Sequence, residues 1–444
     1  MFRLMCREWI EGIWSASIKH SLSSIMLGPR QGTVAPTRDG ARKHRLKKMT
    51  PKESLRYRGL SLSIFAGAFV FGIVMASLGA LLPGLVKKIG FDKAAAGALF
   101  LMMNFAMLVG SLVFGPICDR FGFRVMLLLS TSLVGASFLS LASAGSYAVI
   151  AGSLVGLGLG GGALNGGTNA LLSDISPEQR GAALNRLGIF FGFGALSTPF
   201  FIGALRDRLG LEQIIYILGI FSLIPLALYA LIRFPAAKHS SGFPRSQFLA
   251  LLGNPALYLF AFLLFFQSGN EFTVGGWLST YLPERFGIDA GRASFLLAGY
   301  WAAIMVGRSI SSVLARKVKP EVMVLGSVLL SLAAVAGLLL APSQKFAALA
   351  VVFIGLGFAA IFPTTLAQAG GTFAELSGTA FSVIFVVALA GGMTCPWLVG
   401  KIAQSHTVEA GMGIAIFNCA MIALLQVAIW IRNSWAQQKA LGKY

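Results

Sequence analysis

The chain has 444 residues, of which 56% are hydrophobic and only 12% charged, and its formal net charge is +20. A soluble domain does not need so much apolar surface, and repeated apolar runs of about twenty residues are typical of a membrane protein with many spans. In a soluble protein the positive charge would suggest nucleic acid as a partner. In a membrane protein it follows from the enrichment of Lys and Arg in cytoplasmic loops, so we expect a lipid bilayer as partner and no nucleic acid.

Residues 1–59 form a basic tail, in which the run Arg42–Lys48 is too polar to insert into a membrane. The tail lacks the apolar middle and the small-residue cleavage site of a signal peptide. Two interpretations stay open. The tail binds anionic lipid headgroups, or translation starts at Met49 and residues 1–48 are dispensable.

Twelve apolar runs follow in close order, and a polar segment, residues 234–254, divides them six and six. The sequence therefore predicts an all-α polytopic membrane protein with twelve transmembrane helices. They form two six-helix bundles, residues 60–233 and 255–432, followed by a short tail, residues 433–444. The predicted spans are 60–82, 96–116, 125–144, 147–171, 183–205, 212–233, 255–282, 293–315, 322–341, 345–368, 378–400 and 410–432.

The charge distribution predicts the orientation. With an even number of spans, both termini lie on one side of the membrane. A cytoplasmic N-terminus puts most of the 36 Lys and Arg in cytoplasmic segments, and the bias survives without residues 1–48. We expect an integral protein of the plasma (inner) membrane, monomeric, with both termini cytoplasmic. Asn254 and Pro255, an N-cap followed by proline at the first helical position, mark the start of the second bundle.

The two halves match each other at a constant shift of 197 residues, as from Gly90 to Gly287 and from Asp92 to Asp289. A tandem six-helix repeat is typical of transporters whose halves share one topology and rock about a site near the middle of the membrane. Further pairs at the same shift are Gly72 and Gly269, Gly110 and Gly307, Gly158 and Gly355, Gly160 and Gly357, Glu178 and Glu375, Pro199 and Pro396, and Gly203 and Gly400.

The seventh predicted span carries a polar stretch. Glu271 is the one acidic residue that we place well inside a span. A charge at the bilayer centre costs about 2.5–3.5 kcal/mol on insertion scales, so such an acid faces a bundle interior or a wet cavity. Amides, an acid and two amphipathic aromatics on one side indicate a binding surface; an interhelical hydrogen-bond knot with an aromatic anchor is the alternative. The candidate residues are Gln267, Asn270, Glu271, Trp277 and Tyr281.

Two other spans contribute candidates. Asn165 and Asn169 lie one turn apart on one face of span four, where they line a cavity or bond neighbouring helices. In span ten, Pro363 breaks a backbone bond where the chain is expected to line a cavity. Thr364 and Gln368 beside it are candidates to touch the solute, unless the hydroxyls bond back to a kinked helix.

The loop between spans two and three is a tight turn with cations, one acid and glycine. Gly122 supplies the backbone freedom, and Asp119 can cap the positive N-terminus of a neighbouring helix near Ser377. The position and the pattern resemble the signature loop of the major facilitator superfamily, which implies a gating role. The residues that carry the resemblance are Gly115, Asp119, Arg120, Gly122 and Arg124.

Within that superfamily the chain resembles the fucose permease-like sugar transporters. The resemblance rests on residues 164–174, 183–199 and 355–365, and on Gly269-Asn-Glu271 in span seven. It implies a sugar-like solute and proton coupling. Fucose permeases carry membrane carboxylates in spans one and four, whereas this chain has serines and asparagines there. Glu271 is therefore the candidate carrier of a coupling proton; the alternative is that it only accepts a hydrogen bond from a solute hydroxyl, with transport uncoupled.

The sequence predicts a secondary transporter that moves a small polar, sugar-like solute by alternating access. The direction of transport is left open, and so is the choice between a proton-coupled symporter and uncoupled transport. Efflux of an amphiphilic drug or metabolite is the alternative, and a cavity dominated by Met and Phe would favour it. An enzyme is not expected, because no nucleophile elbow, His-Glu-x-x-His or phosphate loop occurs. The four Cys and four His are scattered, so we expect no catalytic residue, no metal and no cofactor.

Overall fold

The structure, a computed structural model, consists of helices joined by short turns. Residues 56–444 form one compact unit and residues 1–55 another, and all contacts below lie within the first of these. The predicted start at Met49 and most of the predicted linker lie outside the described residues, and so does the end of the C-terminal tail. The described residues are 51–176, 180–232, 234, 251–373 and 377–441.

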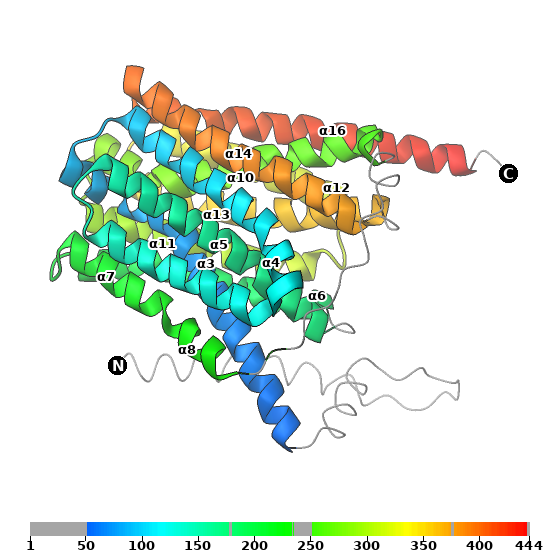
Figure 1. Ribbon diagram of the computed structural model, residues 1–444. Coiled ribbons are helices and arrows are strands. Elements are labelled where there is room, and N and C mark those ends of the chain that lie inside the picture. The colour runs from blue at the N-terminus through cyan, green and yellow to red at the C-terminus, as the bar shows by residue number, and fades with distance from the viewer. Residues whose placement is uncertain (1–50, 177–179, 233, 235–250, 374–376, 442–444) are drawn as a thin grey trace, which may run out of the picture. The chain divides into compact units, whose positions relative to one another are not determined.

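The helices of residues 56–444 run side by side in Figure 1. The first half contains α3 (Pro51–Ile89), α4 (Lys93–Ala142), α5 (Tyr147–Ile175), α6 (Arg180–Leu205), α7 (Leu211–Ser222) and α8 (Ile224–Leu231). The second half contains α10 (Pro255–Phe286), α11 (Ala290–Leu314), α12 (Pro320–Leu339), α13 (Gln344–Thr372), α14 (Ser377–Ser405), α15 (Val408–Met412) and α16 (Ile414–Leu441).

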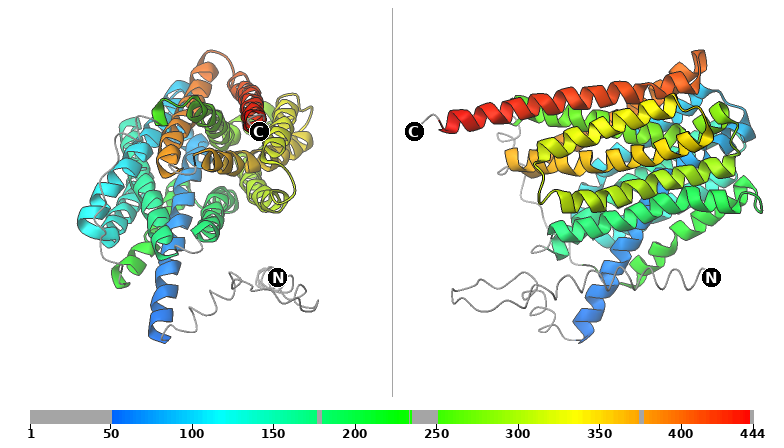
Figure 2. Two further views of the ribbon diagram at one scale, coloured as in Figure 1. Left: turned by 90° about the vertical axis from the view of Figure 1, so that its right-hand side faces the viewer. Right: turned by 180° about the vertical axis from the view of Figure 1, so that it is seen from behind.

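Eleven segments of the described chain are long and apolar enough to cross a membrane. Predicted spans two and three lie in the one long helix α4, whose backbone turns at Gly122 with φ 82°. Helices α7 and α8 together make one span, and so do α15 and α16. With α10 the total is twelve, which confirms the predicted architecture of two six-helix bundles. Figure 2 shows the first-half helices, blue to green, on one side and most second-half helices on the other.

The repeat predicted from the sequence is visible in the helix ends. Asp92 caps α4 and Asp289 caps α11, and each carboxylate accepts a hydrogen bond from the backbone N–H three residues later, at 2.7 and 3.0 Å. Just before these caps, Gly90 and Gly287 adopt φ of +79° and +64°, which glycine tolerates at a helix C-terminus. Equivalent residues therefore begin and end equivalent helices.

The repeat also extends to helix packing. Gly158 of α5 lies so close to α4 that a Cβ there would meet its backbone, and Gly355 of α13 is packed in the same way against α11. Small residues allow this approach of helices within a membrane. The partners are themselves related by the shift of 197 residues: Met103 and Ala106 for Gly158, and Tyr300 and Ala303 for Gly355.

Helix α10 differs from the other spans. It begins as predicted, with the Asn254 side chain accepting a hydrogen bond from the N–H of Ala256 at 3.0 Å and with Pro255 at the first position. Yet α10 is absent from the eleven segments that are apolar enough to cross a membrane. Its polar stretch around Glu271 lowers its hydropathy, and most of its residues are buried against other helices. The span that is least suited to lipid is thus enclosed by protein.

The two halves meet backbone to backbone at one end of the helices. We call it the distal end: α3, α6, α10 and α14 end there, and α16 ends at the opposite, terminal end. Gly79 of α3 touches the backbone of Gly275 in α10, and Lys93 forms an ion pair with Glu284 at 2.8 Å. Further distal contacts between the halves are Gly97 with Gly400, Gly203 with Gly291, and the Lys93 N–H with Gln404.

Candidate functional site

A cavity lies between the two halves, beside the Gly79–Gly275 contact. Its volume is about 40 Å³, enough for a few water molecules, each of which needs roughly 10–15 Å³ by this measure. A solute of sugar size therefore requires the halves to separate. The lining residues are Met75, Leu78, Gly79, Phe100, Met103, Asn104 and Phe191 from the first half, and Glu271, Phe272, Gly275, Gly276 and Trp301 from the second.

Glu271 is the acidic residue of this cavity. It sits in the middle of α10 and is partly exposed to the cavity. The Gln267 side chain, one turn earlier, donates a hydrogen bond to the Glu271 carboxylate at 3.0 Å and a second one to the carbonyl of Phe358 in α13 at 3.3 Å. The Tyr300 hydroxyl of α11 donates to the Glu271 backbone carbonyl at 3.4 Å. The carboxylate is thus oriented by its neighbours and open on one side.

Arg308 of α11 was not among the candidate residues predicted from the sequence. Arg308 lies close enough to the Glu271 carboxylate and the Tyr300 hydroxyl for their charges to interact. No direct ion pair joins it to Glu271, and its buried Nε has no hydrogen-bond partner among the described residues. The available signal was its place inside the span, six residues before the end of α11 and more than a dozen residues after Arg292, the preceding cation of this helix.

Three predicted residues of the same stretch lie in the packing between helices and do not line the cavity. The Trp277 indole donates to the carbonyl of Pro396 at 2.9 Å, and the Tyr281 hydroxyl donates to the carbonyl of Leu338 at 3.2 Å. The Asn270 amide donates to the sulfur of Cys419 at 3.3 Å. All three side chains are fully buried. This is the geometry of interhelical hydrogen bonds, the alternative that the sequence left open for them.

The remaining predicted contact residues lie in α5 and α13. Asn169 donates to the side chain and backbone oxygens of Asn165, at 2.8 and 2.9 Å, so these two amides bond each other. In α13, Thr364 is buried, whereas Gln368 has a buried amide with no partner at either end. None of the four lines the cavity beside Glu271.

The signature loop forms the turn inside α4. Arg124 donates to the carbonyls of Tyr229 and Ala230, the last turn of α8, where a cation is favoured by the helix dipole. Arg120 lies over the ring of Phe121, and Gly115 is in open surroundings. The side chains of Asp119 and of residues 377–379, which the predicted gate requires, lie outside the described residues.

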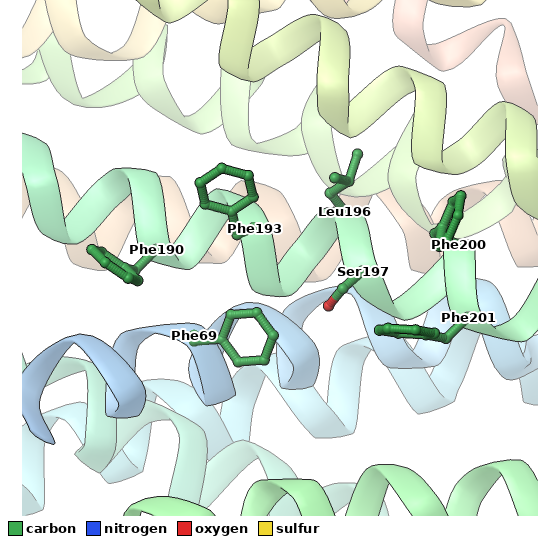
Figure 3. A pocket seen from close by; sticks show the side chains of 7 residues that line it. All are labelled: Phe69, Phe190, Phe193, Leu196, Ser197, Phe200 and Phe201. Carbon is green, nitrogen blue, oxygen red and sulfur yellow. The ribbon is translucent and has the colours of Figure 1, made fainter. Parts of the chain in front are cut away.

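A larger groove runs along α3 and α6 (Figure 3). Its walls are apolar, and its one hydroxyl, on Ser197, bonds the carbonyl of Gly194 in its own helix. A polar solute would find no hydrogen-bond partner here, and the groove suits lipid chains. Its lining residues are Phe69, Phe190, Phe193, Leu196, Ser197, Phe200 and Phe201.

Twelve spans in two repeated halves, with a polar cavity between the halves, define a membrane transporter. The family described as Major Facilitator Superfamily matches residues 64–396. The chain therefore belongs to the major facilitator superfamily, and it is a secondary transporter and not an enzyme.

The similar proteins include sugar transporters. A Helicobacter pylori protein, provisionally named a glucose/galactose transporter, is 24% identical over 400 residues, which cover 85% of this chain and 97% of that protein. The crystal structure of a D-xylose–proton symporter matches with a TM-score of 0.70 and 15% identity, covering 84% of this chain and 97% of the other. A fucose:proton symporter of E. coli matches with a TM-score of 0.60 and 17% identity, covering 84% and 98%. At these identities the structures establish the fold alone.

Proposed function

We propose that this protein carries a small hydroxylated solute of sugar size, coupled to protons, and that the solute binds between Glu271 and Trp301 when the halves separate. The observation that carries the proposal is an oriented carboxylate, held by Gln267, that opens onto a cavity with aromatic walls. Sugars present hydroxyls to acids and amides and a flat apolar face to rings. The glucose/galactose name of a relative that matches over nearly its whole length supports the same class.

The internal repeat supports a functional role for Glu271, as opposed to a structural one. Its equivalent in the first half, 197 residues earlier, is Val74, a fully buried apolar side chain. The shared fold therefore does not require an acid at this position. A carboxylate within a span is costly and is retained where it binds or moves something.

A second candidate is efflux of an amphiphilic compound. It is favoured by the cavity wall, in which methionine and phenylalanine outnumber amides. Met and Phe side chains adapt to apolar ligands of varied shape. The residues that favour it are Met75, Phe100, Met103, Phe191 and Phe272.

Uptake by the purified full-length protein in liposomes separates the two candidates. We expect an inward proton gradient to drive accumulation of one or more labelled hexoses, pentoses or their derivatives, and a bulky amphiphilic dye not to be moved. Trp301→Ala should raise the KM of the solute roughly 2- to 13-fold, because an aromatic contact is worth about 0.5–1.5 kcal/mol. Transport of the dye, with none of the hydroxylated solutes taken up, would establish the second candidate.

We also propose that the terminal end faces the cytoplasm, on the basis of the Lys and Arg distribution. The test replaces the four native cysteines and adds one at Asp207, an exposed residue near the distal end, or at Lys317, exposed near the terminal end. In intact cells an impermeant maleimide should label the cysteine at 207, and label that at 317 only after permeabilisation. The reverse pattern would invert the orientation.

A further inference from the structure

Arg308 is the second charge of the cavity region, and the fold does not require it. Its equivalent in the first half is Ser111, whose hydroxyl bonds the carbonyl of Gly162 at 3.2 Å. Arg308 follows Trp301 by seven residues, two helical turns, so it lies on the same face of α11, about 10 Å nearer the terminal end. It therefore stands on the path between the cavity and the terminal side.

The surroundings of Arg308 differ from those of a cation that only reaches for the membrane surface. A snorkelling arginine keeps its charged head in water and needs no partner in the protein. Arg308 instead has a buried Nε and acts electrostatically on Glu271. The Arg308 side chain is half-buried, and a buried N–H of its guanidinium group without a partner costs free energy unless a ligand or water accepts its hydrogen bond.

The charge balance of Glu271 and Arg308 indicates what kind of ligand completes the hydrogen bonds of Arg308. With Glu271 ionised, Glu271 and Arg308 sum to zero. When Glu271 takes up a proton, Arg308 remains as an uncompensated cation in a low-dielectric region, which is unfavourable. An anion bound with the proton restores neutrality, so both the empty and the loaded protein can reorient without a net buried charge.

We propose that Arg308 binds a carboxylate of the solute, so that the substrate class is sugar acids, hydroxylated carboxylates of monosaccharide size. A guanidinium group matches a carboxylate with two parallel hydrogen bonds. Gln267 and Glu271 take the hydroxyls, and the Trp301 ring takes the apolar face. In each cycle one proton binds Glu271, one solute carboxylate binds Arg308, and both leave on the other side. This inference rests on the proposed function and narrows its solute class from sugar-like compounds to sugar acids.

Few other titratable groups surround Glu271 in the described residues. Helix α11 brings Arg308 and Tyr300 to it. Across the cavity, the first half contributes the neutral amide of Asn104. Elsewhere on the helices that pack against α10 and α11, the ionisable groups nearest α10 are Cys395 of α14 near Gly269, Cys419 of α16 at Asn270, and Glu409 of α15 paired with Arg285 at the distal end. Others on these helices include the exposed Arg186 of α6, Lys345 near the distal start of α13, Lys401 near the distal end of α14 and Arg432 toward the terminal end of α16.

The test compares neutral sugars with their acids in liposomes that contain the full-length protein. The probes are D-galactose with D-galacturonate and D-glucose with D-gluconate. We expect the parent protein to accumulate an acid in response to a pH gradient, at a rate that does not change with membrane potential. Arg308→Gln should raise the KM for that acid about 10- to 100-fold, the effect of losing hydrogen bonds to a charged group. Arg308→Lys should recover part of the loss.

Arg316→Gln is the matched control, since this exposed arginine lies just beyond the end of α11, and it should transport like the parent. Thermal stabilisation of the detergent-solubilised parent by the acid, but not by the neutral sugar, is a second readout that does not depend on the folding of a variant. Uptake of a neutral sugar that the acids do not inhibit and that Arg308→Gln leaves unchanged would overturn the inference and leave the proposed function standing. Absence of uptake of all four probes would overturn the inference, and absence of uptake of the wider panel of hexoses, pentoses and their derivatives would overturn the proposed function as well.

Discussion

Replacing Glu271 with Gln is expected to abolish accumulation of the solute against its gradient while exchange of the solute across the membrane continues. Gln keeps the size of the side chain and its hydrogen bond with Gln267, but it cannot bind and release a proton. For one proton per solute, a gradient of one pH unit supports at most about a tenfold accumulation. The variant should therefore fall from that ratio to equality of the two sides.

The measurement is labelled-solute uptake into proteoliposomes, with and without a pH gradient, beside counterflow from preloaded liposomes. Asp207→Asn is the control, because this exposed carboxylate lies near the distal end and away from the cavity; it should keep both activities. If Glu271 only binds a hydroxyl, Glu271→Gln would instead weaken solute affinity and leave the response to the pH gradient intact. A variant that matches the parent in both assays would make Glu271 a structural residue.

Closing the distal end is the step that Gly79→Leu should prevent. A Cβ at this position would meet the backbone of Gly275 and Gly276 in the opposite half, and backbone cannot move aside as a flexible side chain can. Overpacking costs about 1–3 kcal/mol. Because the cost falls on the distally closed state, the balance should shift roughly 5- to 150-fold toward the state in which the distal ends are apart.

Spin labels at Arg208 and His406 report the separation, since both residues are exposed at the distal end and lie in different halves. We expect a longer distance in Gly79→Leu than in the parent, and a loss of net transport of at least tenfold. Gly299→Leu is the control, because a Cβ at Gly299 meets no atom within 4 Å. An unchanged distance with full transport in Gly79→Leu would show that the Gly79 contact does not govern closure.

The architecture could be predicted from the sequence because a bilayer imposes one length scale on every span. Helices of about twenty apolar residues, separated by short turns, leave few alternatives. The pairs at a shift of 197 residues carried additional information, since Asp92 and Asp289 cap equivalent helices and Gly158 and Gly355 sit at equivalent crossings. Helix caps and close helix crossings require particular residue types at particular positions, so they can be recognised in a single sequence without an alignment.

The candidate site was harder to predict because α10 has neighbours on every side. At 100° per residue, Asn270, Trp277 and Tyr281 are turned from Glu271 by about 80–120° around the helix axis. That difference gives them hydrogen-bond partners in α14, α16 and α12, and the Trp277 ring also lies against Phe100 of the first half. A sequence reveals which residues share a helix face, but the partner of each face depends on how the helices assemble.

Arg308 was missed for a related reason. Near the end of a predicted span, an arginine is ordinarily a cation that reaches for the membrane surface. Its relation to Glu271 connects two helices that are adjacent in space through residues 37 positions apart in sequence. No local pattern signals such a relation, although the absence of a basic residue at Ser111, the equivalent position, distinguishes the two halves.

The limited hydropathy of α10 has a consequence for how the protein is made. As each span leaves the ribosome, it enters the lipid by its own preference for an apolar phase, and α10 is the weakest candidate among the described helices. Its main packing partners, α14 and α16, are synthesised later. The nascent chain therefore has to hold α10 beside the translocation machinery, or at the membrane surface, until those helices arrive. Biogenesis of the second half would then be a concerted event, in which the residues that serve transport delay membrane integration.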